Sequence, residues 1–266
     1  MTISHKPRKR FGQNFLVDQQ IVDQIISAIG ANSNDNLIEI GPGTGAITKN
    51  LVKLCPKMSL IELDRDLIEI LKTNFIHLQD LKIFNMDALK TDFSEFYDGR
   101  KLRLVGNLPY NISTPLLFHL LSVGHLIQDM HFMLQREVVD RMNAIPGDKN
   151  YGRLSVMIQY TCRVIPLIPV PPESFSPAPK VQSAVVRLKP YSQRPYIASN
   201  ENLLSTIVKL CFQQRRKTLR NCLKPYDNCL SSIGPLIDLT SRPEELSIRE
   251  FVELTNIIDQ LKDKDL

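Results

Sequence analysis

The chain has 266 residues, of which 43% are hydrophobic and 23% charged, so it can bury a substantial core and form one large and one small domain. The N-terminal sequence MTISHKPRKRFGQNFL lacks the apolar segment of a signal peptide, and no apolar run is long enough to span a membrane. We therefore expect a cytoplasmic protein with no membrane partner. The five cysteines form no C-x-x-C pair and the histidines lack metal-ligand spacing, so neither a disulfide framework nor a metal site is expected.

The net charge of +5 is unevenly distributed along the chain. The cations before the first acidic residue are Lys6, Arg8, Lys9 and Arg10. A second acid-free block, from 209 to 224, contains Arg215, Arg216, Lys217 and Arg220. Clusters of this kind indicate a polyanionic partner, although either block alone fits a solvated surface equally well. The first block resembles an organellar transit peptide in composition, but we interpret it as a binding arm because it runs directly into Phe11, Phe15 and Leu16, which can pack.

Short apolar runs alternate with helical patterns through the first 190 residues. The runs predict strands at 37–40, 58–63, 82–85, 102–105, 131–134, 164–168 and 184–188, and 3.6-residue periodicity predicts helices at 66–74 and 114–121. This alternation is typical of a mostly parallel α/β sheet that is covered on both faces. The last two strands lie close together in sequence and are expected to form a hairpin-like edge.

The composition changes after Pro190. The segment PYSQRPYIASN is typical of a linker, and amphipathic helices are predicted at 203–224 and 248–261. Ser247 and Glu250 have the spacing of a capping box at the start of the second helix. We therefore expect a domain at 1–190, with an N-terminal basic arm, and a small all-helical domain at 191–266.

In an open parallel sheet, ligands bind at the carboxyl ends of the strands, and polar or glycine residues follow four of the predicted strands. The first strand leads into GPGTGA, which contains Gly41 and Gly43 and lets the backbone approach a ligand closely. Glu62 at the second strand can accept hydrogen bonds from ribose hydroxyls. Asp87, beyond the third, can accept from an exocyclic amine, and Asn107 ends the fourth. Helix capping or turn formation would also account for either carboxylate.

The glycine loop alone does not identify the ligand, because a glycine loop followed by an acidic residue also satisfies the dinucleotide fingerprint. A nicotinamide enzyme is therefore an alternative. Against it, Pro42 removes a loop N–H that a pyrophosphate would use. S-adenosylmethionine carries no phosphate, and Asp87 offers an adenine contact. The four positions favour S-adenosylmethionine and a Rossmann-like methyltransferase sheet.

The stretch GNLPY at 106–110 has the chemistry needed to activate an adenine amine. The lone pair of that nitrogen is delocalised into the ring, and two acceptors can localise it: the Asn107 side-chain oxygen and the Leu108 carbonyl, exposed by the turn at Pro109. Tyr110 offers a face for stacking, worth ~1–3 kcal/mol per base. A tyrosine buried at a strand end is an equally simple interpretation. Phe175 lies in a proline-rich loop and could face Tyr110 across a base, although an aromatic plugging the core is the simpler interpretation from the residues alone.

The chain contains seven motifs in the following order: KRFGQNFL, IEIGPGTGAIT, IELD, NMDAL, GNLPYNIS, FMLQREV and FSPAPKVQSAVVRL. This is the order found in the small-subunit ribosomal RNA adenine dimethyltransferases, the KsgA or RsmA family, which the chain resembles over nearly its whole length. By that resemblance, the cofactor site comprises Asn14, Leu16, Gly41, Gly43, Glu62, Asp87 and Asn107. The target adenine would be held by Asn107, Leu108, Pro109, Tyr110 and Phe175.

The resemblance implies S-adenosylmethionine-dependent dimethylation of two adjacent adenines in the 3′-terminal hairpin loop of 16S rRNA, with a role in small-subunit biogenesis. RNA affinity would come from the basic arm and from the helical domain through the 215–220 block. We expect a monomer that binds the small subunit. Two alternatives are a methyltransferase of the large-subunit RNA, against which Leu108 and FSPAPKV argue, and a non-enzymatic assembly factor, which would be expected to have lost Asn107 or Glu62.

Overall fold

The computed structural model describes residues 13–262, which pack as two compact units. The first unit comprises the chain up to Val139 together with Val164–Pro190, and the second comprises Asp140–Arg163 and the chain from Tyr191 onward. The division differs from the expected one in residues 140–163, which belong with the C-terminal helices. Tyr151 shows why, since its hydroxyl donates to the carbonyl of Leu246 at 2.9 Å and its ring meets the edge of Phe212.

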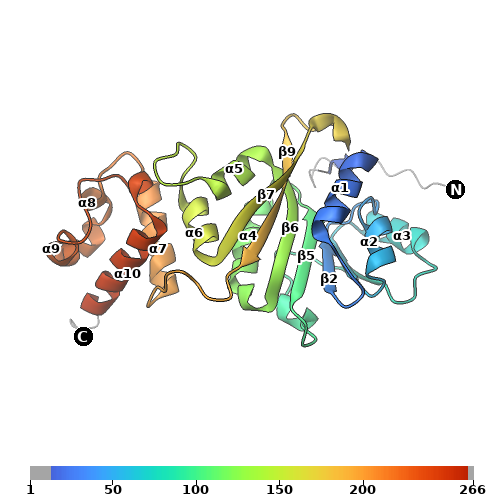
Figure 1. Ribbon diagram of the computed structural model, residues 1–266, viewed down its shortest axis with the longest axis horizontal. Coiled ribbons are helices and arrows are strands. Elements are labelled where there is room, and N and C mark those ends of the chain that lie inside the picture. The colour runs from blue at the N-terminus through green and yellow to red at the C-terminus, as the bar shows by residue number, and fades with distance from the viewer. Residues whose placement is uncertain (1–12, 263–266) are drawn as a thin grey trace. The chain divides into compact units, whose positions relative to one another are not determined.

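The first unit is built on a seven-stranded sheet, counted within residues 13–262, whose order is β4-β3-β2-β5-β6-β9-β7. The strands in that order are β4 (Lys82–Asn85), β3 (Ser59–Glu62), β2 (Asn36–Ile40), β5 (Leu102–Asn107), β6 (Ile127–Gln135), β9 (Ser183–Pro190) and β7 (Cys162–Val170). The pairs from β4 to β6 are parallel and β9 is antiparallel to β6. All seven predicted strands are confirmed. The expected edge formed by the last two is confirmed as well, since β9 and β7 are neighbours (Figure 1).

The strand order contains a switch point between β2 and β5. From β2 the chain runs outward through β3 to β4, then returns to place β5 on the other side of β2. Connections leave the two strands in opposite directions at such a point, which opens a crevice at their carboxyl ends. The topology therefore fixes where a ligand can bind.

Both faces of the sheet are covered. Leu37 and Val105 pack with α1 (Gln19–Ile29), which buries Ile21 and Ile25 in the same apolar cluster. Their neighbour Ile38, on the opposite face, is also fully buried. The remaining helices of this unit are α2 (Thr48–Leu54), α3 (Arg65–Asn74), α4 (Ser113–Ser122) and the 3₁₀ turns η2 (Phe93–Phe96), η3 (Gly124–Leu126) and η4 (Pro172–Ser174). A further helix, α5 (Arg136–Asn143), begins in this unit and ends in the second. The predicted helices at 66–74 and 114–121 correspond to α3 and α4.

A small strand pair joins the beginning of the described chain to the proline-rich loop. β1 (Phe15–Leu16) lies antiparallel to β8 (Phe175–Ser176). Beside the pair, the N–H of Val17 donates to the Ser174 carbonyl at 2.9 Å, and the Ser174 hydroxyl donates to Asp18 at 2.9 Å. Because Asp18 also caps α1, these contacts fix residues 15–18 to the sheet domain.

The second unit is helical. Its elements are α6 (Arg153–Thr161), α7 (Glu201–Gln213), α8 (Leu219–Cys222), η5 (Lys224–Cys229), α9 (Leu230–Ile233), η6 (Pro243–Glu245) and α10 (Ile248–Lys262). The helix predicted at 248–261 and its capping box are confirmed, since Ser247 and Glu250 exchange hydrogen bonds between side chain and backbone.

The single helix predicted at 203–224 is wrong, because α7 ends at Gln213 and a new turn begins at Leu219. At the break, the N–H groups of Leu219 and Arg220 donate to the distant carbonyls of Ser241 and Leu239 at 2.8 and 3.0 Å. These tertiary bonds replace those that a continuous helix would make, so the periodicity could not reveal the break. No helix within residues 13–262 is long and apolar enough to cross a membrane.

Candidate active site

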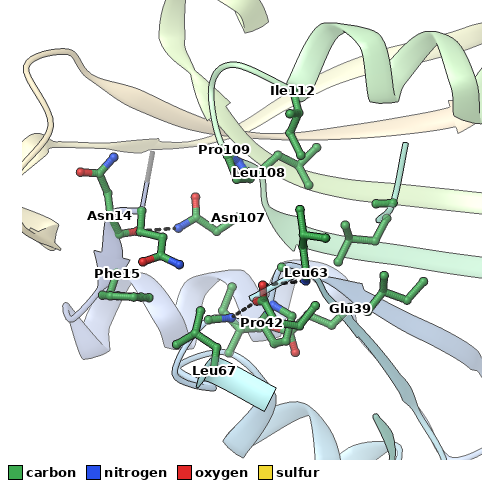
Figure 2. A pocket seen from close by; sticks show the side chains of 18 of the residues that line it. Asn14, Phe15, Glu39, Pro42, Leu63, Leu67, Asn107, Leu108, Pro109 and Ile112 are labelled. Carbon is green, nitrogen blue, oxygen red and sulfur yellow. Dashed lines mark hydrogen bonds between the residues drawn. The ribbon is translucent and has the colours of Figure 1, made fainter. Parts of the chain in front are cut away.

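A cavity of about 200 Å³ lies at the switch point, within the first unit (Figure 2). Its lining combines the loop after β2, the ends of β3 and β5, the turn after β4 and residues 13–16 of the N-terminal segment. Among the predicted site residues, it brings together Asn14, Leu16, Gly41, Gly43, Glu62, Asp87, Asn107, Leu108, Pro109 and Tyr110. The first and last of these residues, Asn14 and Tyr110, are 96 positions apart in sequence.

The three glycine N–H groups of the loop after β2 are already bonded within the protein, two of them to β3. Gly41 donates to the carbonyl of Ile61 at 2.9 Å, Gly43 to the carboxylate of Glu62 at 3.3 Å and Gly45 to the carbonyl of Pro42 at 2.9 Å. Pro42 has no N–H. A pyrophosphate needs free loop amides, and none of these positions offers one. The glycines serve backbone geometry instead, since both Gly41 and Gly43 have positive φ.

The charge of the lining is acidic. It contains Glu39, Glu62 and Asp87, and no Lys, Arg or His occurs among the described residues around the cavity. An acidic lining suits a ligand with positive charge, such as a sulfonium that also bears an ammonium group. It is unsuited to the two phosphates of a nicotinamide dinucleotide. The geometry therefore fits S-adenosylmethionine and disfavours the dinucleotide alternative.

Glu62 ends β3 with its carboxylate held from the backbone. One oxygen, Oε1, accepts from the N–H groups of Leu63 and Asp64, both at 2.9 Å, and Oε2 accepts from Gly43. Burial raises the pKa of Glu62, and the three N–H groups act in the opposite direction. The carboxylate is thus fixed in place before any ligand arrives, which suits an acceptor for two neighbouring hydroxyls.

Glu39 is a feature of the cavity that the sequence analysis missed. It is buried within β2, and the Thr48 hydroxyl donates to its Oε2 at 2.7 Å. Burial raises the pKa of Glu39 to about 7, opposed by the Thr48 bond and assisted by the nearby charge of Glu62. A carboxylate inside the apolar strand LIEI, just before a ligand loop, is a signal that could have identified it.

Asp87 follows β4 and lines the same cavity. Its Oδ1 accepts from the N–H of Leu89 at 3.0 Å, and its carbonyl accepts from Thr91, so the residue shapes the turn. Within the described chain, no residue donates to Oδ2. Turn formation, which was the alternative explanation for this aspartate, is therefore compatible with a binding role for the second oxygen.

Asn107 is the last residue of β5, and its amide has a defined orientation. Its Nδ2 donates to the backbone carbonyl of Asn14 at 3.0 Å, drawn in Figure 2 as the dashed line between Asn107 and Asn14. Because the nitrogen is used in this way, the amide oxygen is the atom left to accept a hydrogen bond. Before it, Gly106 is required by close packing, since a Cβ there would lie 2.4 Å from the carbonyl oxygen of Ile40.

Tyr110 lines the cavity and is partly exposed. Its hydroxyl shares a hydrogen bond of 2.9 Å with Ser183 of β9. The hydroxyl is therefore tethered at the sheet, which restricts the ring that carries it. Tyr110 is therefore not the fully buried strand-end tyrosine of the alternative interpretation.

Phe175 is not among the residues that line the cavity. Its side chain is 4% exposed and belongs to the apolar cluster that includes Leu16 and Val185. Pairing of β8 with β1 places the ring on this side, so the structure shows the core arrangement that the residues alone suggested. A contact between Phe175 and the target base stays a prediction.

The candidate RNA-binding residues fall into three groups. Lys6, Arg8, Lys9 and Arg10 lie outside the described residues. Arg215 is engaged within the second unit, where it pairs with Glu244 and donates to the Lys149 carbonyl at 2.6 Å. Arg216, Lys217 and Arg220 are exposed, as is Arg215 itself, whose side chain is 44% exposed. Arg215 thus differs from its neighbours in being paired with Glu244, and not in its exposure.

Comparisons with known proteins agree with this architecture. Residues 4–260 match the family described as ribosomal RNA adenine dimethylase. A protein of Saccharophagus degradans named ribosomal RNA small subunit methyltransferase A is 58% identical over 96% of this chain and 95% of its own. A solved dimethyladenosine transferase from Plasmodium falciparum is 27% identical, with a TM-score of 0.77 over 95% of this chain and 98% of its own. The solved 23S rRNA methyltransferase ErmE, 21% identical, has a TM-score of 0.71 over 93% of this chain and 100% of its own.

The switch-point cavity, the glycine loop bonded to β3 and the acidic lining, together with the structural likeness, define a Rossmann-like, S-adenosylmethionine-dependent methyltransferase. Over nearly its whole length, the chain belongs to the ribosomal RNA adenine dimethylase family. The predicted fold class, enzyme class and cofactor are thereby confirmed.

Proposed function

We propose that this enzyme dimethylates the N6 groups of two adjacent adenines in the 3′-terminal hairpin loop of 16S rRNA, acting as a cytoplasmic monomer during small-subunit biogenesis. The name of the 58% identical relative supports the small subunit as partner. Loop bases suit the chemistry, because an unpaired base can be turned out at low cost.

In this proposal, S-adenosylmethionine supplies, when bound, an electrophilic methyl group on a sulfonium. Glu62 accepts from the ribose hydroxyls, and Oδ2 of Asp87 accepts from the adenine amine of the cofactor. Asn14, Leu16, Gly41 and Gly43 form the walls around the remainder. The acidic lining stabilises the cofactor's positive charge.

The observation that carries the proposal is the orientation of the Asn107 amide. With Nδ2 held by the Asn14 carbonyl, Oδ1 can accept one N–H of the target amine. The carbonyl of Leu108, in the turn at Pro109, can accept the other. Two acceptors localise the nitrogen lone pair and stabilise the positive charge that grows on it, and the proton becomes acidic as the new bond forms. A general base with a shifted pKa is not required.

Tyr110 stacks on the target base in this arrangement. Its tether to Ser183 restricts the ring, so less side-chain entropy is lost when a base binds. The exposed cations Arg216, Lys217 and Arg220, together with the basic arm, contact phosphates and supply affinity without reading sequence.

The proposal is tested by single-turnover methylation of immature small subunits at saturating S-adenosylmethionine, with the modified adenines located by mass spectrometry. Asn107→Ala should abolish most transfer and leave subunit binding nearly intact. Tyr110→Phe should retain substantial activity, because only the tether to Ser183 is lost, whereas Tyr110→Ala should lose much more. Methylation of large-subunit RNA instead would refute the proposed substrate, and equal loss in both Tyr110 variants would refute stacking.

A further inference from the structure

The segment of residues 13–16, here called the strap, borders the cavity and contacts both of its sides. All four residues line the cavity. At its far end, Leu16 is held by the β1–β8 pair. In its middle, the Phe15 ring lies against the glycine loop, where a Cβ on Gly43 would come within 3.1 Å of it. The strap is therefore packed against the cavity. Its first two residues, Gln13 and Asn14, form hydrogen bonds with the ends of β3 and β5.

Gln13 ties the strap to the end of β3. Its Nε2 donates to Oδ2 of Asp64 at 3.0 Å, and Asp64 is 2% exposed. Asp64 is itself fixed, because its Oδ1 caps α3 through the N–H of Asp66 at 3.1 Å. Its own N–H donates to Oε1 of Glu62 at 2.9 Å. Gln13 is thus connected through one residue to the carboxylate proposed to hold the ribose.

Asn14 ties the strap to the end of β5. Its backbone carbonyl accepts from Nδ2 of Asn107 and so determines which amide atom is left for the target amine. Gln13 and Asn14 are consecutive, with Gln13 anchored at β3 and Asn14 at β5. The Asn14 carbonyl cannot move far without straining the bond between Gln13 and Asp64.

We propose that Gln13 is a positioning residue for methyl transfer: its bond to Asp64 holds the Asn14 carbonyl where it orients the Asn107 amide. The inference rests on the proposed function, since it assigns Asn107 to the target amine. It adds that the cofactor side and the acceptor side of the site are coupled through the strap. Loss of the bond lets the Asn107 amide rotate, even when S-adenosylmethionine is bound.

The test exchanges the two partners of the bond. Gln13→Glu places two carboxylates against each other and breaks the contact. Asp64→Asn retains a cap for α3, because asparagine caps as well as aspartate, and the Gln13 amide can turn over to accept from it. In the double variant Gln13→Glu/Asp64→Asn, an amide again faces a carboxylate. Gln19→Glu is the matched control, because Gln19 donates to Asp23 at 2.7 Å on the exposed side of α1.

The readouts are the single-turnover rate at saturating S-adenosylmethionine, the cofactor Kd by calorimetry and the melting temperature. Gln13→Glu should slow transfer by about tenfold or more, the effect of losing one hydrogen bond to a charged group. The double variant should recover to within about threefold of wild type, which a pairwise coupling predicts. Gln19→Glu should stay close to wild type, and Asp64→Asn should lie between wild type and Gln13→Glu, because its bond to Gln13 is retained without the charge.

A purely structural strap would lower the melting temperature or weaken cofactor binding, and leave the rate at saturation unchanged. That result overturns the proposal, as does a double variant that is as slow as Gln13→Glu. A wild-type enzyme that binds S-adenosylmethionine and does not methylate small subunits refutes the proposed function instead. The two failures are therefore distinguishable.

Discussion

Glu39→Gln should make the free enzyme more stable at alkaline pH and remove a pH dependence of unfolding. In the folded protein, burial raises the pKa of Glu39 to about 7 from the ordinary 4.5, so the folded state binds the proton more tightly than the unfolded state. Glu39 therefore contributes stability that is fully present below about pH 4.5 and is lost as pH rises through about 7. The glutamine retains an oxygen that can accept from Thr48.

The difference between 4.5 and about 7 corresponds to about 3 kcal/mol over the whole titration. Between about pH 5.5 and about pH 8.5, ionisation of Glu39 should lower the free energy of unfolding of the wild type by about 2 kcal/mol, a loss that the variant does not have. An unpartnered amide N–H₂ in the variant costs about 1–3 kcal/mol at every pH. This cost lowers the variant's free energy of unfolding by the same amount throughout, so it does not alter how the difference from wild type changes with pH. At about 2–4 °C per kcal/mol for a domain of this size, the melting temperatures should diverge by about 4–8 °C across this range.

The assay is thermal unfolding followed by circular dichroism at both pH values, without cofactor. The quantity compared is the melting temperature of the variant minus that of the wild type, which should rise with pH. Thr48→Val provides a second comparison, since losing the hydroxyl donor should raise the pKa of Glu39 further. A variant-minus-wild-type difference that is the same at both pH values would refute the assignment of a raised pKa to Glu39.

Four further changes have directions set by the structure. Glu62→Ala should weaken S-adenosylmethionine binding by about 1.5–3 kcal/mol per lost charge-assisted bond in calorimetric titration, and unchanged affinity would remove Glu62 from the site. Arg216→Gln with Arg220→Gln should weaken subunit binding and flatten its salt dependence. Arg215→Gln should flatten the salt slope less than these changes, because Arg215 is already paired with Glu244 at the surface of its unit, and an equal flattening would contradict that expectation. Gly106→Ala should destabilise the folded protein, measured by urea unfolding, because its Cβ would lie 2.4 Å from a carbonyl oxygen of β2; an unchanged midpoint would contradict that contact.

The sequence by itself determined the sheet and the edge on which the site lies. Strands alternate with helices, and apolar runs report burial directly, so the predicted strands fell where the structure has them. The carboxyl ends of parallel strands share one edge, which is why Glu62, Asp87 and Asn107 could be assigned to a common site from their positions alone. Motif order then identified the family, because several matches in sequence are far more specific than one glycine loop.

Tertiary structure alone decided what each side chain does there. Periodicity reports the burial of a local face, and it contains no information on which distant group a polar atom meets. The break between α7 and α8 depends on carbonyls of 239 and 241, and Arg215 is tethered by Glu244. The side chain of Phe175, in the strand pair of β8 and β1, is buried in the core. The orientation of the Asn107 amide depends on a carbonyl 93 positions earlier, a contact that exists only after the chain has folded.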